Sequence, residues 1–390
     1  MRVVGLMSGT SYDAIDAAAA DIVLKDGRLE LSPLGLISER YDDELRAALA
    51  GALPPATTTL ERVCLLDTRI GQAFAAAAVR ADRELCARTT ELVASHGQTV
   101  YHWAEGGQVH GTLQLGQPAW IAEATGCTVV SDFRPRDVAA GGQGAPLVGL
   151  VDLLWLRGRP GVPAALNLGG IANVTVAGRA GEPVAFDTGP ANALVDAAVA
   201  ELTGGRLGYD EDGALAAAGR VDQPLLDRLL AEPYYRLPPP KTTGKELFHA
   251  GHVREALAGV GPLPPQDVIA TLTRLTARTV ADALRPLGAT EVVASGGGTR
   301  NPALMAALRA ELAGTPLRTS DELGMPAAAK EAYAFAVLGF LTVHGVAGTV
   351  PACTGARGAR VLGSITPGGR VPPLASPAER RVDSLVVMDR

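Results

Sequence analysis

Cysteine is scarce in this sequence, and the few cysteines present form no recognisable pattern. Cys64, Cys86, Cys127 and Cys353 lie far apart, and no Cys-x-x-Cys pair occurs in the 390 residues. A disulfide framework or a cysteine-based zinc site needs cysteines in close or regular spacing. We therefore expect reduced, mostly packed thiols and a cytoplasmic protein.

Long apolar runs and an excess of positive charge are also missing. The most apolar late segment, Ala332 to Val343, is well short of the roughly 20 residues that a membrane-spanning helix needs. The chain opens directly on a predicted strand, without the basic and apolar regions of a secretory signal. A formal net charge of −6 with no basic run argues against a nucleic-acid partner. We expect neither a membrane nor a nucleic acid as partner.

Three common motifs of nucleotide-binding proteins and hydrolases do not occur. The sequence has no Gly-x-x-x-x-Gly-Lys-Ser/Thr, which excludes a P-loop, and no Gly-x-Gly-x-x-Gly after the first strand, which argues against a Rossmann fold. A Gly-x-Ser-x-Gly elbow is missing too, which weakens a serine hydrolase.

The order of apolar segments predicts two similar α/β domains. A chain of 390 residues exceeds the size at which one core stops growing. An apolar strand, a glycine-containing turn and a second strand occur near residue 3 and again near residue 164. We expect residues 1–135, joined by 346–390, to form domain I and 136–345 to form domain II. The Pro-rich segment 233–247 is expected to be an ordered loop, and the tail after residue 370 a surface appendage.

Two glycine turns carry groups suited to phosphate. The stretch "GLMSGTSYDAID" combines the Gly9 backbone, the Thr10 and Ser11 hydroxyls and the carboxylates of Asp13 and Asp16. Backbone N–H groups and hydroxyls can wrap a phosphate while carboxylates hold its magnesium, although a plain hairpin turn also fits. In "SGGGTRN", the glycines between a strand and a helix let a flat ligand or phosphate approach the backbone, or form a simple tight turn.

The stretch "SHGQTVYH" offers several polar side chains. Ser95 and His96 are adjacent on a predicted strand and point to opposite faces, so they cannot form a nucleophile–base pair. A zinc site from His96, His102 and His110 fits no familiar spacing. A sugar- or amide-binding surface that includes Gln98 and a capped strand end both remain open.

Charged residues near two other turns are further candidates. Arg134 and Asp137 lie beside a Gly-rich loop, where arginine can grip a carboxylate in two-point fashion, or where the charges form a surface ion-pair cluster. Asp187 follows an apolar strand and is ionised at neutral pH, as a general base must be. Glu331 lies early in a predicted helix, where its charge also suits the helix dipole.

Together these segments resemble the ordered motifs of the anhydro-N-acetylmuramic acid kinase family. The matching stretches are "GLMSGTSYDAID", "SHGQTVYH", "LQLGQP", "DFRPRDVAAGGQGAPLV", "NLGGIANVT", "FDTGPANALVD", "KTTGKELF" and "SGGGTRNPALM". The resemblance implies the two-domain actin-like ATPase (ribonuclease H-like) fold, with ATP in the interdomain cleft. It also implies a murein-recycling reaction, in which 1,6-anhydro-N-acetylmuramic acid, ATP and water give N-acetylmuramic acid 6-phosphate and ADP.

The resemblance assigns a role to each matching residue. Asp187 is expected to be the base, and Asp13 and Asp16 to hold Mg²⁺. The expected nucleotide-binding residues, Asp13 and Asp16 among them, are Gly9, Thr10, Ser11, Asp13, Asp16, Gly169, Gly170, Asn173, Gly296, Gly297 and Gly298. The residues expected to hold the sugar and its lactyl carboxylate are Ser95, His96, Gln98, Arg134, Asp137 and Glu331.

Three positions depart from the family pattern, and two other functions stay open. Ala14, Gly149 and Lys245 stand where the family usually has Gly, Pro and Arg, and Ala14 would be strained if the backbone there needed a positive φ. A kinase acting on a free sugar hydroxyl and a chaperone- or actin-like ATPase are the alternatives. The sequence is compatible with a homodimer but does not determine the oligomeric state.

Overall fold

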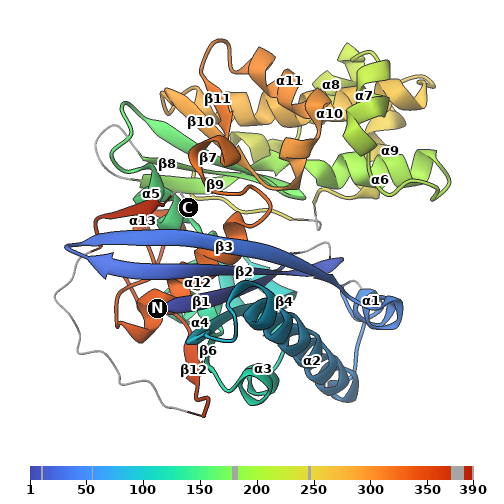
Figure 1. Cartoon of the computed structure of the whole chain (residues 1–390). Helices are drawn as coiled ribbons and strands as arrows, with labels where there is room; N and C mark the ends of the chain where they lie inside the picture. Colours follow the sequence, from blue (N-terminus) through green and yellow to red (C-terminus); the bar gives the residue numbers. More distant parts are fainter. Residues whose placement is uncertain (10–11, 55, 178–182, 245–246, 370–381, 389–390) are drawn as a thin grey trace. The chain divides into compact units, whose positions relative to one another are not determined.

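The chain divides into two compact units in a computed structural model that describes all residues except 10–11, 55, 178–182, 245–246, 370–381 and 389–390 (Figure 1). Unit 1 comprises Met1–Arg157 and Ala329–Arg390, and unit 2 comprises Gly158–Ala328. The boundaries predicted from the sequence are at residues 135 and 346. In the structure the first boundary comes later, after Arg157, because helix α5 (Gly149–Leu156) packs against β13 (Ser384–Val387) of unit 1. The second boundary comes earlier, before Ala329, because helix α12 (Lys330–Val343) packs on β1, β2 and β4 of unit 1.

Unit 1 is built on an eight-stranded sheet in the order β12-β6-β4-β1-β2-β3-β13, with β5 paired to β4. Strands β1, β2 and β3 form an antiparallel meander, and β4 and β6 continue the sheet in parallel with β1. The strands are β1 (Arg2–Ser8), β2 (Ala14–Lys25), β3 (Arg28–Arg40), β4 (Leu92–Glu105), β5 (Gln108–Leu115), β6 (Thr128–Ser131), β12 (Ser364–Thr366) and β13.

Two helices cover opposite faces of this sheet. Val4 and Leu6 of β1 share a core with Phe74 of α2 (Leu60–Leu85). The intervening Gly5 faces α12 so closely that a side chain there would overlap the Ala332 carbonyl. Period-two alternation along β1 therefore places one helix on each face. The other helices of unit 1 are α1 (Asp43–Ala50), α3 (Pro118–Thr125), α4 (Phe133–Ala139), α5 and α13 (Pro351–Thr354).

Unit 2 repeats the same strand plan. Its sheet has the order β11-β10-β7-β8-β9, in which β7, β8 and β9 form an antiparallel meander and β10 and β11 extend it in parallel with β7. The strands are β7 (Pro163–Leu168), β8 (Ile171–Ala177), β9 (Pro183–Pro190), β10 (Glu291–Ser295) and β11 (Leu317–Thr319). A meander continued by parallel strands, present twice, confirms the predicted ribonuclease H-like fold class.

Helix α10 (Pro265–Leu284) joins the two cores of unit 2. Its C-terminal half, including Ala277 and Val280, packs on the sheet, while its N-terminal half, including Val268 and Leu272, packs in a second cluster that other helices form together with Tyr234 and Phe248. The other helices are α6 (Asn192–Leu202), α7 (Ala214–Ala218), α8 (Gln223–Leu230), α9 (Ala250–Leu257) and α11 (Pro302–Glu311), with 3₁₀ turns η1 (Glu211–Gly213), η2 (Pro233–Arg236), η3 (Gly297–Arg300) and η4 (Asp321–Leu323).

Residues 370–381 of the tail, which the sequence suggested as a surface appendage, lie outside the described residues, but the described end of the tail differs from that prediction. Strand β13 pairs in parallel with β3, and Leu385 is only 2% exposed. The Arg157 side chain donates a hydrogen bond to the Asp383 carbonyl at 2.8 Å. The described end of the tail thus completes the sheet of unit 1.

Three further features of the described residues concern the cysteines, the Pro-rich loop and the length of the apolar helices. The four cysteines are unbonded, and three of them are buried while Cys64 is exposed. Residues 237–244 follow η2 without helix or strand, as expected for the Pro-rich loop. Among the described residues, no helix combines the length and the apolar character needed to cross a bilayer.

Candidate active site

The first glycine turn is hydrogen-bonded to the buried side-chain amide of Gln98. Gln98 is completely buried, and its Nε2 donates to the Gly9 carbonyl at 3.1 Å. Its Oε1 lies 2.7 Å from Ser8 Oγ and accepts from the Tyr41 hydroxyl at 3.3 Å. These partners belong to the protein, so Gln98 fastens the end of β1 to β4. Thr10 and Ser11 lie outside the described residues.

The departure at Ala14 causes no strain. Ala14 is the first residue of β2 and pairs with Arg40, so its backbone is extended. The positive φ of this turn, 45°, belongs to Tyr12 instead. The second departure, Gly149, is the first residue of α5, the helix position at which the proline usual in the family is also well accommodated. The third, Lys245, lies outside the described residues.

Arg134 and His96 form a hydrogen-bonded pair in unit 1. Arg134 Nε donates to His96 Nε2 at 2.9 Å, and its Nη1 donates to the Gly144 carbonyl at 2.7 Å. His96 Nδ1 lies 2.8 Å from the Gly97 carbonyl. Because Nε2 accepts, Nδ1 must carry the proton, so the ring is neutral. Burial, and next the charge of Arg134, lowers the pKa of His96 well below its ordinary value.

Asp137 holds the Gly-rich loop that follows α4. It is completely buried, its Oδ2 accepts from the Gly144 N–H and its Oδ1 accepts from the Thr354 hydroxyl, each at 2.8 Å. The same Gly144 offers its carbonyl to Arg134. Asp137 and His96, which the sequence suggested as direct sugar contacts, therefore support the half-buried Arg134 from two sides.

Glu331 and Ser95 lie in the same part of unit 1. Burial raises the pKa of Glu331, while the charges of Lys330 and Arg134 lower it and those of Asp16 and Asp152 raise it. These couplings bring Glu331, Arg134 and Asp16 into one electrostatic neighbourhood. Lys330 forms a buried ion pair with Asp152 at 2.7 Å, next to Glu331 in the chain. Ser95 is buried, and its hydroxyl has no hydrogen-bond partner among the described residues.

In unit 2 a row of polar side chains crosses three strands. Asn167 of β7 pairs with Asn173 of β8, which pairs with Asp187 of β9. Residues opposite one another in antiparallel strands point to the same face of the sheet. All three are half-buried, whereas the residues flanking them along their strands are mostly buried. Asn167 was not predicted as a site residue, although it belongs to the "NLGG" stretch and is an asparagine like Asn173.

Asp187 is bound to the Pro-rich loop. Its backbone N–H donates to the Lys241 carbonyl at 3.0 Å, and its carbonyl accepts from the Tyr234 hydroxyl at 2.8 Å. The side-chain Oδ2 accepts from the Thr243 N–H at 2.9 Å. Burial lowers the pKa of Lys241, and the neighbouring Asp187 carboxylate partly opposes this effect.

The remaining glycines surround the ends of β7 and β10. Gly296 has φ of +86°, and a side chain there would come within 2.6 Å of Asn167 Oδ1. Gly297 is exposed, and a side chain there would meet no atom closer than the Arg300 guanidinium, at 4.0 Å. The carbonyls of Gly169 and Gly170 accept from the N–H groups of Asn192 and Ala191 at 3.1 and 2.9 Å, which ties this turn to the start of α6.

The donor set of the first turn suits magnesium better than zinc. Asp13 is exposed and Asp16 half-buried, and Mg²⁺ in phosphoryl-transfer sites is usually held by one or two carboxylates together with substrate phosphates. Within the described residues, no three His, Cys, Asp or Glu side chains come together as a metal site. His102 instead lies 3.3 Å from Thr112 Oγ1, and His110 packs on the Trp103 ring.

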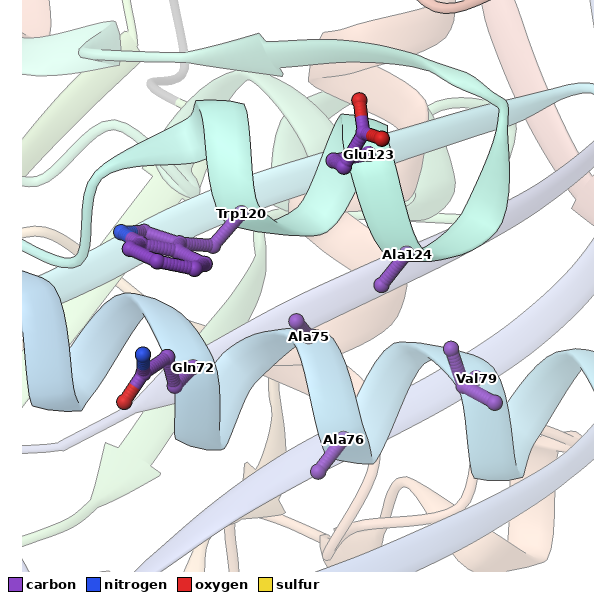
Figure 2. Close-up of a pocket in the computed structure, with 7 residues that line it drawn as sticks. All are labelled: Gln72, Ala75, Ala76, Val79, Trp120, Glu123 and Ala124. Carbon is purple, nitrogen blue, oxygen red and sulfur yellow. The ribbon is translucent and has the colours of Figure 1, made fainter.

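A separate groove lies on the outside of unit 1. It has a volume of about 360 Å³, between α2 and α3 (Figure 2). Apolar side chains line it, with Trp120 at one end and Gln72 and Glu123 at its rim. None of the residues discussed above contributes to this groove.

The sequence of this chain is similar to one family of known proteins over almost its whole length. The family described as "Anhydro-N-acetylmuramic acid kinase" matches residues 1–368. A relative with that name from Streptomyces avermitilis is 73% identical over 378 residues, covering 96% of this chain and 97% of its own. Another with the same name, from Rhodococcus erythropolis, is 62% identical over 397 residues, covering 99% and 100%.

Proposed function

Because this chain belongs to the anhydro-N-acetylmuramic acid kinase family and is a kinase, we propose that it opens 1,6-anhydro-N-acetylmuramic acid with water while it phosphorylates O6. The products are N-acetylmuramic acid 6-phosphate and ADP, as in cell-wall recycling. The observation that carries the proposal is the Asp187 carboxylate, oriented at the end of β9 in a row with Asn167 and Asn173.

Asp187 acts as the general base on water. An ordinary sugar kinase removes a proton from the attacking hydroxyl, but O6 in the anhydro sugar is an ether oxygen without a proton. Asp187 therefore takes a proton from a water whose oxygen bonds to C1. The C1–O6 bond breaks, and O6 bonds to the γ-phosphorus as ADP leaves. One proton is released overall, and the Asp187 carboxylate accepts it from the attacking water.

Arg134 and Glu331 contact the sugar. The arginine suits the lactyl carboxylate, because a guanidinium can hold a carboxylate through two parallel hydrogen bonds. His96 and Asp137 keep that guanidinium and its loop in place, and Gln98 keeps the neighbouring turn in place. The unpartnered Ser95 hydroxyl is a further polar group available to the sugar.

The glycine turns bind ATP. Gly9, Thr10 and Ser11 bind the phosphates together with Gly169, Gly170 and Asn173, and Gly296–Gly298 contact the rest of the nucleotide. Backbone donors and position dominate the stabilisation of a transferring phosphoryl group. Mg²⁺, held by Asp13 and Asp16, would offset the charge of that group when it is bound.

The direct test is phosphate transfer to the anhydro sugar. Purified protein with ATP, Mg²⁺ and 1,6-anhydro-N-acetylmuramic acid should form ADP and the 6-phosphate in equal amounts. Free N-acetylmuramic acid, which has a 6-hydroxyl, serves as the comparison substrate. Faster phosphorylation of the free sugar would contradict the proposal and favour a kinase that acts on hydroxyl groups.

A further inference from the structure

Strand β9 is one of the two edge strands of the unit 2 sheet, and Asp187 lies on it. The outward N–H and C=O groups of an edge strand have no partner strand and normally bond to water. At Asp187 both groups instead bond to the Pro-rich loop, through the Lys241 carbonyl and the Tyr234 hydroxyl. The carboxylate bonds to the same loop through the Thr243 N–H.

Three polar groups of one residue are thus held by residues 234–243. A side chain can rotate about its own bonds, and its backbone can shift along the strand. The Thr243 N–H restricts the first movement, and the Lys241 and Tyr234 bonds restrict the second. Such a residue is fixed in position and in direction, which is what a general base needs, since misplacement by about 1 Å can cost about a hundredfold in rate.

The two parts of this loop are also fastened to each other. Lys241 Nζ donates to the carbonyls of Tyr234 and Tyr235 at 3.1 and 3.0 Å, and lies 4.7 Å from the centre of the Tyr234 ring. The Tyr234 ring packs edge-on against Phe248, a completely buried residue of the same core cluster as Leu272 of α10. The contacts on Asp187 are therefore anchored in the core of unit 2.

We propose that Tyr234 and Lys241 are positioning residues for the reaction, and that Tyr234 and residues 241–243 together form a strap that aims the Asp187 carboxylate. This inference rests on the proposed role of Asp187 as the base. The Tyr234 hydroxyl fixes the Asp187 backbone, and Lys241 holds Tyr234 against the 241–243 segment.

The chain offers a matched pair of variants. Tyr234→Phe removes the hydroxyl that donates to Asp187 and keeps the ring. Tyr235→Phe removes the neighbouring hydroxyl, which is buried and has no hydrogen-bond partner among the described residues. We expect Tyr234→Phe to lower kcat about three- to tenfold, the value of one neutral hydrogen bond, with the KM for ATP unchanged. Tyr235→Phe should keep the wild-type kcat.

Placing each change in an Asp187→Asn background separates positioning from a general structural role. If Tyr234 acts through Asp187, the Tyr234→Phe change causes no further loss once the carboxylate is gone. Lys241→Met removes the hydrogen bonds from Lys241 Nζ to the Tyr234 and Tyr235 carbonyls and keeps Tyr234 itself. It is measured in both backgrounds, so that the test does not depend on one variant folding well. We expect the same pattern from it.

The outcomes are distinguishable. A wild-type kcat in Tyr234→Phe and Lys241→Met, with Asp187→Asn strongly impaired, would overturn the strap and leave the proposed function standing. An equal fold-loss in both backgrounds would also overturn it, because the residues would then act on the structure as a whole. Wild-type turnover in Asp187→Asn would remove the proposed base and the strap together.

Discussion

At the scale of single residues, the polar side chains of the site divide by where their hydrogen bonds go. His96, Gln98 and Asp137 direct their polar atoms to protein partners, although their residue types alone suggested contact with a sugar. The sequence indicates that these side chains have hydrogen-bond partners if they are buried, because histidine, glutamine and aspartate are costly to bury without them. It does not tell whether the partner is a ligand or another residue, because that depends on how β4 and α4 pack.

The lowered pKa of His96 predicts how the free energy of unfolding depends on pH. Burial, and next the Arg134 charge, lowers its pKa in the folded protein, so the unfolded chain binds an extra proton below the ordinary value of about 6.5. The stability that neutral His96 contributes is complete above that pH and is lost as the pH falls below it. The loss approaches about 1.4 kcal/mol per pH unit for one proton.

Urea unfolding of the wild type and of His96→Gln, at about pH 7.5 and about pH 5.5, measures this contribution. The wild type should lose about 1 kcal/mol more than the variant between the two conditions. Burial also lowers the pKa of His102 and His252, but both titrate in both proteins and cancel in the difference. An identical pH dependence in the two proteins would contradict the assignment of His96 as neutral in the fold.

At the scale of elements, hydrophobic periodicity predicted the long helices and the central strands, and it missed elements with mixed signals. Helix α4 contains Pro135 and two arginines and was not predicted, yet the proline lies in the first turn, where its missing N–H costs no hydrogen bond. Strand β13 was missed because its four residues follow a long Pro-rich stretch and gain their stability from β3. Non-local pairing of this kind leaves no periodic pattern in a short segment.

Strand β13 should contribute measurably to the stability of unit 1. Leu385→Ala removes a side chain that is 2% exposed, and we expect the free energy of unfolding to fall by roughly 2 kcal/mol. Met388→Ala is the control, because Met388 is 37% exposed and should change that free energy by less than about 0.5 kcal/mol. Unfolding in urea measures both. Equal stability of Leu385→Ala and the wild type would mean that β13 is dispensable for the fold.

At the scale of the whole molecule, the repeated strand–turn–strand pattern correctly predicted two units of similar topology. The pattern did not predict the residues at which the chain passes from one unit to the other. The reason is that α5 and α12 are apolar helices, and their composition would let them pack on either sheet. The packing of α12 on β1, β2 and β4, and of its backbone on Gly5, shows which sheet it covers. The motif order, by contrast, identified the family over nearly the whole chain, because glycines and carboxylates at turns depend on local sequence.

Ring opening and phosphoryl transfer, in the proposed reaction, share one water molecule and one base. The anhydro bridge occupies the β face of C1, so a water aligned by Asp187 approaches from the opposite face and gives the α-anomer first, as in a one-step inverting glycosidase. The reaction run in oxygen-18 water, with product analysed before it exchanges through its open-chain form, tests this directly. The label should appear in the C1 hydroxyl and be absent from the phosphate, on the α-anomer. Label in the phosphate, or initial formation of the β-anomer, would contradict the mechanism.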